Sequence, residues 1–174
     1  MVLSLSRVGV LALSVMTGCT PTHDWREVRP TDSPVRLLMP CKPSVQERRV
    51  ALAGQPARLA LHACAAGGQT WALAIADVAD PARVGPAMAE LIASAAANIG
   101  AAATRSTPLQ VPGATPNPGS QRLRLQGKLP DGQAVQMHLA VFTHGTRVFQ
   151  ATALGEQVPD EAVETFFNAI RVRL

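Results

Sequence analysis

Three consecutive segments in the C-terminal half alternate apolar and polar residues, and this pattern restricts the fold more than any other feature. They span residues 121–127, 134–143 and 146–154, with Gly132 and Gly145 in the short connections between them. Alternation with a period of two is typical of β-strands, and short glycine-containing connections favour antiparallel neighbours. We therefore expect an antiparallel meander with one buried face and one partly polar face.

The first half of the chain shows the same alternation in shorter stretches. A polar segment at 24–28 has Trp25 as its apolar anchor and predicts a short edge strand. Proline and glycine separate the remaining stretches, as expected between strands. These further strand candidates span residues 35–41, 48–53, 57–64 and 71–77.

Two segments have helical periodicity instead. Asp80 and Pro81 supply an N-cap and a proline at the first helical position, and apolar residues recur at helical spacing from there to Ile99. A second helix is expected to begin at Pro159, with its own apolar stripe and a brief final strand after it. Between the helices, residues 104–120 contain four prolines and two glycines and predict a long loop.

These elements together predict a fold of the α+β class. An antiparallel β-sheet packs with two main helices, because each amphipathic helix must bury its apolar stripe against another element. The length suits one domain, and we place it at residues 35–174.

The N-terminus has a different pattern. Arg7 is followed by a mainly apolar run that ends at Met16 and is about half the length needed to cross a bilayer. Gly18 then precedes Cys19, and the stretch resembles the lipobox of bacterial lipoproteins, with Met16 where leucine is usual. The resemblance implies that residues 1–18 are a removed signal peptide and that Cys19 becomes the lipidated first residue. A plain secreted protein with an unrelated cysteine is the alternative.

If Cys19 is lipidated, residues 19–34 form a lipidated tether. The membrane is then a partner of the protein, through the N-terminal lipid anchor. Each buried CH₂ of an acyl chain contributes about 0.8 kcal/mol, so two or three chains hold a domain stably. In the sorting rule of enteric bacteria, an aspartate directly after the lipidated cysteine retains a lipoprotein in the inner membrane. This chain has Thr20 at that position. We therefore expect a protein of the bacterial cell envelope that faces the periplasm, with the outer membrane favoured over the inner.

The remaining two cysteines, Cys41 and Cys64, form an even pair in an oxidising compartment, which predicts a disulfide. Such a bond would contribute on the order of 3 kcal/mol to stability. The alternative is a copper or zinc site that uses both cysteines and His62. No fourth ligand is evident in the sequence, so we predict no metal site.

The sequence contains no recognisable catalytic or cofactor motif. The serine-hydrolase, zinc-protease, phosphate-loop and dinucleotide-binding patterns are all missing, so we expect neither an enzyme nor a cofactor. The net charge of +4, which falls by one when Arg7 is removed, does not indicate nucleic-acid binding. A hydrolase with an unrecognised site remains an alternative.

Basic residues recur on the polar side of several strand candidates. Arg122, Arg124 and His138 belong to adjacent predicted strands, and Arg58 and His62 share one side of the 57–64 strand. They form a possible binding face for anionic lipid headgroups, lipopolysaccharide or an acidic envelope protein. An ordinary solvated surface is the alternative. Two helices on the opposite face would expose such a patch, whereas one helix on each face would cover it.

Short strings along the chain also resemble a known family. Residues 38–43, 73–77, 98–100 and 165–167 read LMPCKP, LAIAD, NIG and TFF. These strings and the element order resemble small bacterial lipoproteins with a domain similar to the PsbP subunit of photosystem II. The resemblance implies an α/β/α sandwich and a non-enzymatic accessory or binding role, with no functional residue carried over. A periplasmic ligand- or metal-binding protein is the alternative function.

Overall fold

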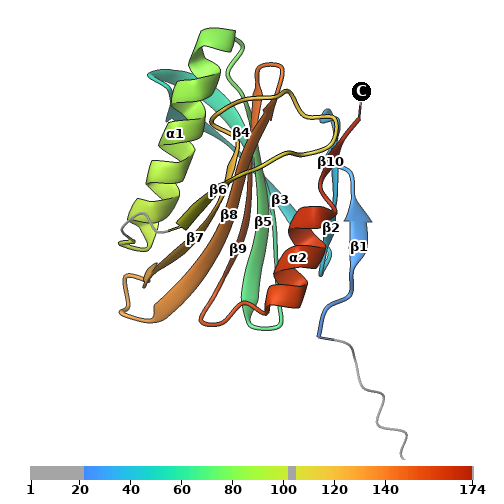
Figure 1. Ribbon diagram of the computed structural model, residues 1–174, viewed down its shortest axis with the longest axis vertical. Coiled ribbons are helices and arrows are strands. Elements are labelled where there is room, and N and C mark those ends of the chain that lie inside the picture. Colours follow the sequence, from blue (N-terminus) through green and yellow to red (C-terminus); the bar gives the residue numbers. More distant parts are fainter. Residues whose placement is uncertain (1–21, 102–104, 174) are drawn as a thin grey trace, which may run out of the picture.

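The computed structural model describes residues 22–101 and 105–173, and its centre is a seven-stranded antiparallel sheet (Figure 1). The strand order is β3-β4-β5-β9-β8-β7-β6, so the C-terminal meander forms one half of the sheet and the β3-β4-β5 hairpins form the other. The strands are β3 (Ser44–Leu52), β4 (Gln55–Ala66), β5 (Gln69–Asp77), β6 (Arg105–Pro108), β7 (Gln121–Lys128), β8 (Ala134–His144) and β9 (Arg147–Gly155).

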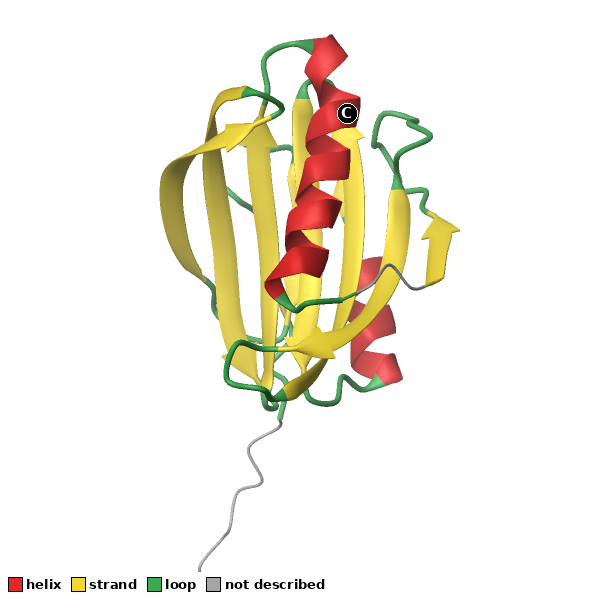
Figure 2. Cartoon of the chain, turned by 90° about the vertical axis from the view of Figure 1, so that its left-hand side faces the viewer, coloured by secondary structure: helices red, strands yellow, loops and turns green. Residues whose placement is uncertain are grey.

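Helix α1 (Pro81–Asn98) packs on one face of this sheet (Figure 2). The Asp80 carboxylate accepts a hydrogen bond from the Ala82 amide at 2.9 Å, which confirms the N-cap. Gly100 follows the helix at φ 57°. The amides of Gly100 and Ala101 donate to carbonyls of the last turn, which satisfies groups that a helix end leaves unpaired. The stripe that the helix buries includes Val84, Ala87, Met88, Ala95 and Ile99.

The opposite face is covered by helix α2 (Asp160–Asn168) and by a small sheet of three strands. The small sheet has the order β1 (Arg26–Val28), β2 (Val35–Met39) and β10 (Arg171–Val172). The core beneath it contains the largest buried aromatic side chains, Trp71, Phe142, Phe149 and Phe166. Figures 1 and 2 place α1 and α2 on opposite sides of the large sheet.

The α+β class is thus confirmed, but the expectation of one partly polar sheet face is wrong for the middle of the sheet. Strand β8 is buried without interruption from Met137 to Thr143. Alternate side chains of this strand enter the core under α1 and the core under α2. Local alternation does not reveal this arrangement, because the second covering layer comes from distant parts of the chain.

The proline-rich loop begins with a strand that the sequence did not predict. Strand β6 pairs with β7, and the rest of the loop is fixed by backbone hydrogen bonds. The Thr115 amide donates to Thr143, and the Val172 amide donates to Pro112, each at 2.9 Å. Gly113 has φ 80°, and a Cβ there would meet the Val172 carbonyl oxygen at 2.0 Å. The loop is therefore part of the fold.

Part of the expected tether also packs on the domain. The edge strand predicted at 24–28 is present as β1, and the Asp24 amide donates to the Pro40 carbonyl at 2.9 Å. The ring of Trp25 lies 5.8 Å from that of Trp71, so the folded domain extends upstream of Val35. Residues 1–18 and Cys19 lie outside the described residues. Within the part of the chain that is described, no helix is long and apolar enough to cross a membrane.

Candidate functional site

The five residues of the predicted binding face do lie on one face of the large sheet, the face that carries α2. His62 pairs with Leu73, a residue of the core under α2, and directly paired residues project to the same side. His138 alternates along β8 with Ala140 and Phe142 of the same core. The middle of this face is covered by α2 and the small sheet. The five residues are therefore divided into two clusters, one near each edge of the sheet.

The first cluster, which we call the Arg58 groove, has a volume of about 290 Å³. It lies between strands β3 and β4 and the turn at residues 31–33. Arg58 donates from Nε to Glu47 at 3.1 Å, and Arg147 lies 3.7 Å from Asp77 on the other side. Both arginines of the groove are therefore paired with carboxylates, and Asp32 adds a further negative charge to its lining. Val45 is an exposed hydrophobic residue on its rim.

His62 lies in this groove and is 7% exposed. No hydrogen bond to its ring is present within residues 22–101 and 105–173. Burial lowers the pKa of His62, and the negative charge of Glu47 offsets part of that effect. The ring is therefore neutral at pH 7.

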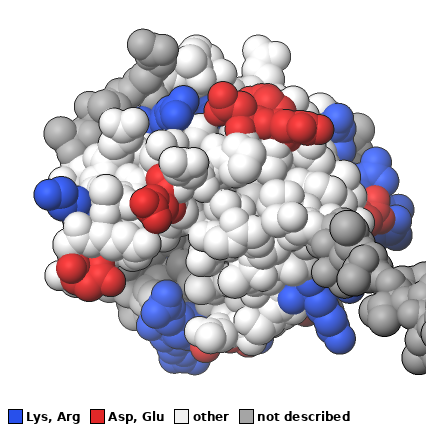
Figure 3. All heavy atoms as spheres, turned by 90° about the horizontal axis from the view of Figure 1, so that it is seen from below, with Lys and Arg blue, Asp and Glu red and all other residues white. Residues whose placement is uncertain are grey.

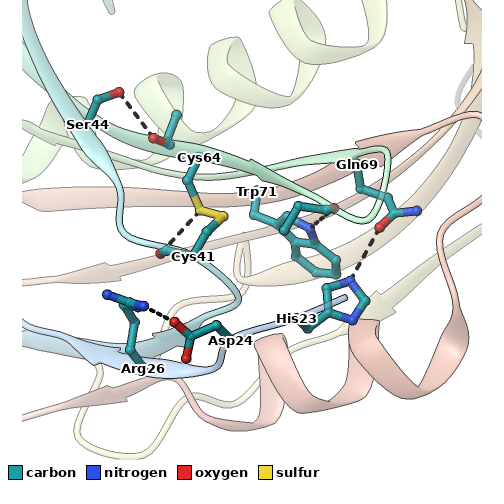
Figure 4. Close-up of a disulfide and its surroundings, with 10 residues drawn as sticks. His23, Asp24, Arg26, Cys41, Ser44, Cys64, Gln69 and Trp71 are labelled. Carbon is teal, nitrogen blue, oxygen red and sulfur yellow. Dashed lines mark hydrogen bonds and ion pairs between the residues drawn. A yellow bond between two sulfur atoms is a disulfide. The ribbon is translucent and has the colours of Figure 1, made fainter. Parts of the chain in front are cut away.

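The disulfide predicted between Cys41 and Cys64 is present, with Cα atoms 6.0 Å apart. It joins the end of the small sheet to β4 of the large sheet, close to Trp71 and His23 (Figure 4). Because the two sulfurs are bonded to each other, neither can serve as the thiolate ligand that the alternative metal site requires. The described residues contain no cluster of three or more metal-ligating side chains.

The second cluster, which we call the His138 hollow, has a volume of about 170 Å³ beside α2. It brings together Arg122, Arg124 and His138, as expected if β7 and β8 are neighbours. Thr107 of β6 and Leu123 of β7 complete its lining. Its charged lining residues, Arg122 and Arg124, are basic, and Arg124 donates to the Gln136 side chain at 3.1 Å.

Arg122 is held in place by α2. Its guanidinium donates two hydrogen bonds to the Glu164 carboxylate, at 2.6 and 3.2 Å, and lies 4.7 Å above the ring of Phe167. The hydrogen bonds from Arg122 lower the pKa of Glu164, so this carboxylate is ionised at neutral pH. This contact could not be predicted from the sequence, because Glu164 occupies an ordinary exposed position of an amphipathic helix.

His138 is 5% exposed, and its Nε2 atom has no hydrogen-bond partner among the described residues. Burial is the main cause that lowers the pKa of His138, and the positive charges of Arg124 and Arg122 lower it further. Asp160 and Glu164 on α2 act in the opposite direction. The His138 ring is therefore neutral at pH 7 and has one nitrogen without a hydrogen-bond partner among the described residues. Charged groups of both signs lie near it.

A third hollow, of about 540 Å³, lies under the proline-rich loop and was not predicted. Its lining is mainly apolar and includes Leu109, Val111 and Phe142. The prolines of the loop were the sequence signal for an unusual segment, but they do not specify a ligand.

No protein-family model matches this chain, and no curated protein matches it either.

Proposed function

We propose that this chain is a lipid-anchored protein of the bacterial envelope, whose domain binds a partner or ligand without catalysing a reaction. The Gly18-Cys19 pattern supplies the anchor, and the Cys41–Cys64 disulfide carries the argument for the compartment. Disulfides persist in the periplasm and other oxidising compartments and are rare in the cytosol of ordinary bacteria. Both features support the proposed location in the envelope.

The position of the first described residues fits this arrangement. Thr22 is three residues beyond Cys19, and three extended residues span at most about 10 Å. From His23 onward the chain packs on the domain, because the His23 ring lies 5.9 Å from that of Trp71. A lipid on Cys19 would therefore hold the domain close to the bilayer by the end at which β1 begins.

Figure 3 shows this end of the molecule from below. Basic and acidic side chains both lie around its edge, and uncharged surface occupies much of its middle. Attraction to anionic lipids grows with the number of clustered basic residues, at about 1 kcal/mol each. A mixed edge of this kind supplies little such attraction, so the acyl chains would provide the attachment.

The binding role is supported by the His138 hollow on the α2 face. The charged residues that line it, Arg122 and Arg124, are both basic, which suits recognition of an acidic group on a partner or ligand. We also propose that the domain is related to the PsbP-like family of accessory modules. The helix on each side of an antiparallel sheet supports that relationship, although a shared fold by itself does not define a function.

Mass spectrometry of the N-terminal peptide tests the anchor. When the full chain is expressed in a bacterial host, we expect a peptide that begins at Cys19 and carries two or three acyl chains, with the protein in the membrane fraction. Cys19→Ala should abolish acylation and release the domain from membranes after extraction at high salt. The matched control is the double variant Cys41→Ser and Cys64→Ser, which should still be acylated. An unmodified Cys19 in the wild-type chain would contradict the proposal.

A further inference from the structure

We propose that Arg122, Arg124 and His138, with the hydroxyl of Thr107, form a binding site for a phosphate-type oxyanion. The site is the His138 hollow, which lies at the junction of β6, β7 and β8 beside α2. This inference does not depend on lipidation of Cys19, because it rests on the geometry of the folded domain alone.

The first argument is the fixed position of a cation. Arg122 cannot move easily, because Glu164 holds its terminal nitrogens and Phe167 lies against its guanidinium plane. Its Nε has no hydrogen-bond partner among the described residues. A guanidinium that is already oriented loses less conformational entropy when it binds an anion, and arginine matches phosphate and carboxylate oxygens well.

The second argument is His138 itself. A buried polar atom without a partner costs about 1–3 kcal/mol, so proteins seldom keep one without a reason. His138 is among the residues that line the hollow, and its Nε2 is buried and has no hydrogen-bond partner among the described residues. An oxyanion in the hollow could accept a hydrogen bond from a ring N–H. The Thr107 hydroxyl donates a long hydrogen bond of 3.5 Å to the Arg122 carbonyl oxygen, and it could turn to donate to the anion instead.

The third argument is the balance of charge. The groups around His138 are Arg122 and Arg124 on β7 and Asp160 and Glu164 on α2, two positive and two negative. The four charges near His138 therefore balance while the ring is uncharged, and the two that line the hollow itself, Arg122 and Arg124, are both positive. An anion that enters would be stabilised further by a protonated imidazole, so anion binding should be coupled to proton uptake at His138.

The size of the hollow limits what it can hold. A volume of about 170 Å³ accommodates one phosphate group with a few water molecules, and it is smaller than the roughly 300–1,000 Å³ of typical sites for drug-sized ligands. The group could belong to a free anion or to a lipid headgroup, and these two sources differ in what is attached to the phosphorus.

Titration calorimetry at pH 6 tests the proposal and separates the two sources. The probes are inorganic phosphate and dihexanoyl phosphatidylglycerol below its micelle concentration. We expect saturable binding of at least one probe, with proton uptake visible as a dependence of the heat on the ionisation enthalpy of the buffer. Tighter binding of inorganic phosphate would identify a free anion, and tighter binding of the short-chain lipid would identify a headgroup.

Two arginine variants show where the anion binds. Arg124→Gln removes an exposed cation of the hollow and should weaken binding about tenfold or more. Arg58→Gln removes an exposed cation of the other cluster and should bind like the wild-type chain. His138→Gln should retain weaker binding and lose the coupled proton uptake. The proposal is overturned if neither probe saturates, or if Arg58→Gln weakens binding as much as Arg124→Gln.

Discussion

The Arg58 groove and the His138 hollow share a sheet face and similar residue types, but they differ in how their charges are satisfied. In the groove, Arg58 and Arg147 pair with the carboxylates of Glu47 and Asp77, mostly at exposed positions. In the hollow, Arg122 is held by a helix and His138 is buried with an unpaired nitrogen. The difference indicates that sequence similarity between two basic clusters does not make them equivalent. In the hollow, the cation is held by a helix and packs against an aromatic ring, and the unpaired histidine nitrogen is fully buried.

Removing the disulfide is the strongest test of whether the two clusters open independently of each other. Replacing Cys41 and Cys64 together by serine should lower the free energy of unfolding by about 2–5 kcal/mol, because the unfolded chain regains conformational freedom. Urea unfolding measures the loss. Hydrogen exchange should show that β2 and β4, which the disulfide links, open more readily than β7 and β8, and β4 lines the Arg58 groove. Uniform loss of protection across both clusters would contradict the separation.

Two arginine substitutions compare how much a single side chain of each cluster contributes to stability. Arg122→Ala removes two charge-assisted hydrogen bonds and the contact with Phe167, and the side chain is only 22% exposed. We expect a loss of about 1 kcal/mol. Arg58→Ala removes an ion pair whose arginine is 74% exposed, and it should leave stability unchanged within error. Equal losses in thermal or urea unfolding would show that exposure does not distinguish the two clusters.

We expect His62 and His138 to make the stability of the folded chain depend on pH, with a smaller effect than those of the substitutions above. The pKa values of His62 and His138 are lowered in the folded state, mainly by burial. The unfolded chain therefore binds more protons as the pH falls through about 6.5, and stability should decrease from pH 7 to pH 5.5.

His62→Gln and His138→Gln should each make that decrease shallower. Phosphate should reduce the contribution of His138 and leave that of His62 unchanged, since a bound anion favours the protonated ring. Urea unfolding at the two pH values, with and without phosphate, checks both statements. A decrease that neither variant alters would assign the pH dependence to other groups.

Most strands could be predicted because buried residues alternate in them, as Leu123 and Leu125 do in β7. The errors fall at the sheet edges. Strand β3 begins at Ser44 rather than at residue 48, because its first six residues are exposed and polar enough to hide the alternation. Strand β6 was missed for a similar reason, since residues 105–108 contain no large apolar side chain. Edge strands carry little hydrophobic signal because only part of their surface is buried.

The candidate sites could be predicted only in part. The period of two correctly placed Arg122, Arg124 and His138 on one face, and the cysteine count correctly paired Cys41 with Cys64. The position of α2 could not be predicted, because its docking depends on contacts between segments far apart in the chain. That position decides that His138 is buried and that Arg122 meets Glu164. The division of one basic face into two unlike clusters is therefore a tertiary property.

The most direct measurement is an NMR titration that follows the imidazole resonances of His62 and His138 in one sample, with and without inorganic phosphate. Both rings are buried and both have lowered pKa values, so each serves as the control for the other. We predict that phosphate shifts the His138 resonances and raises the pKa of His138, while His62 titrates unchanged. Equal responses of the two rings, or no response of His138, would contradict the distinction between the groove and the hollow.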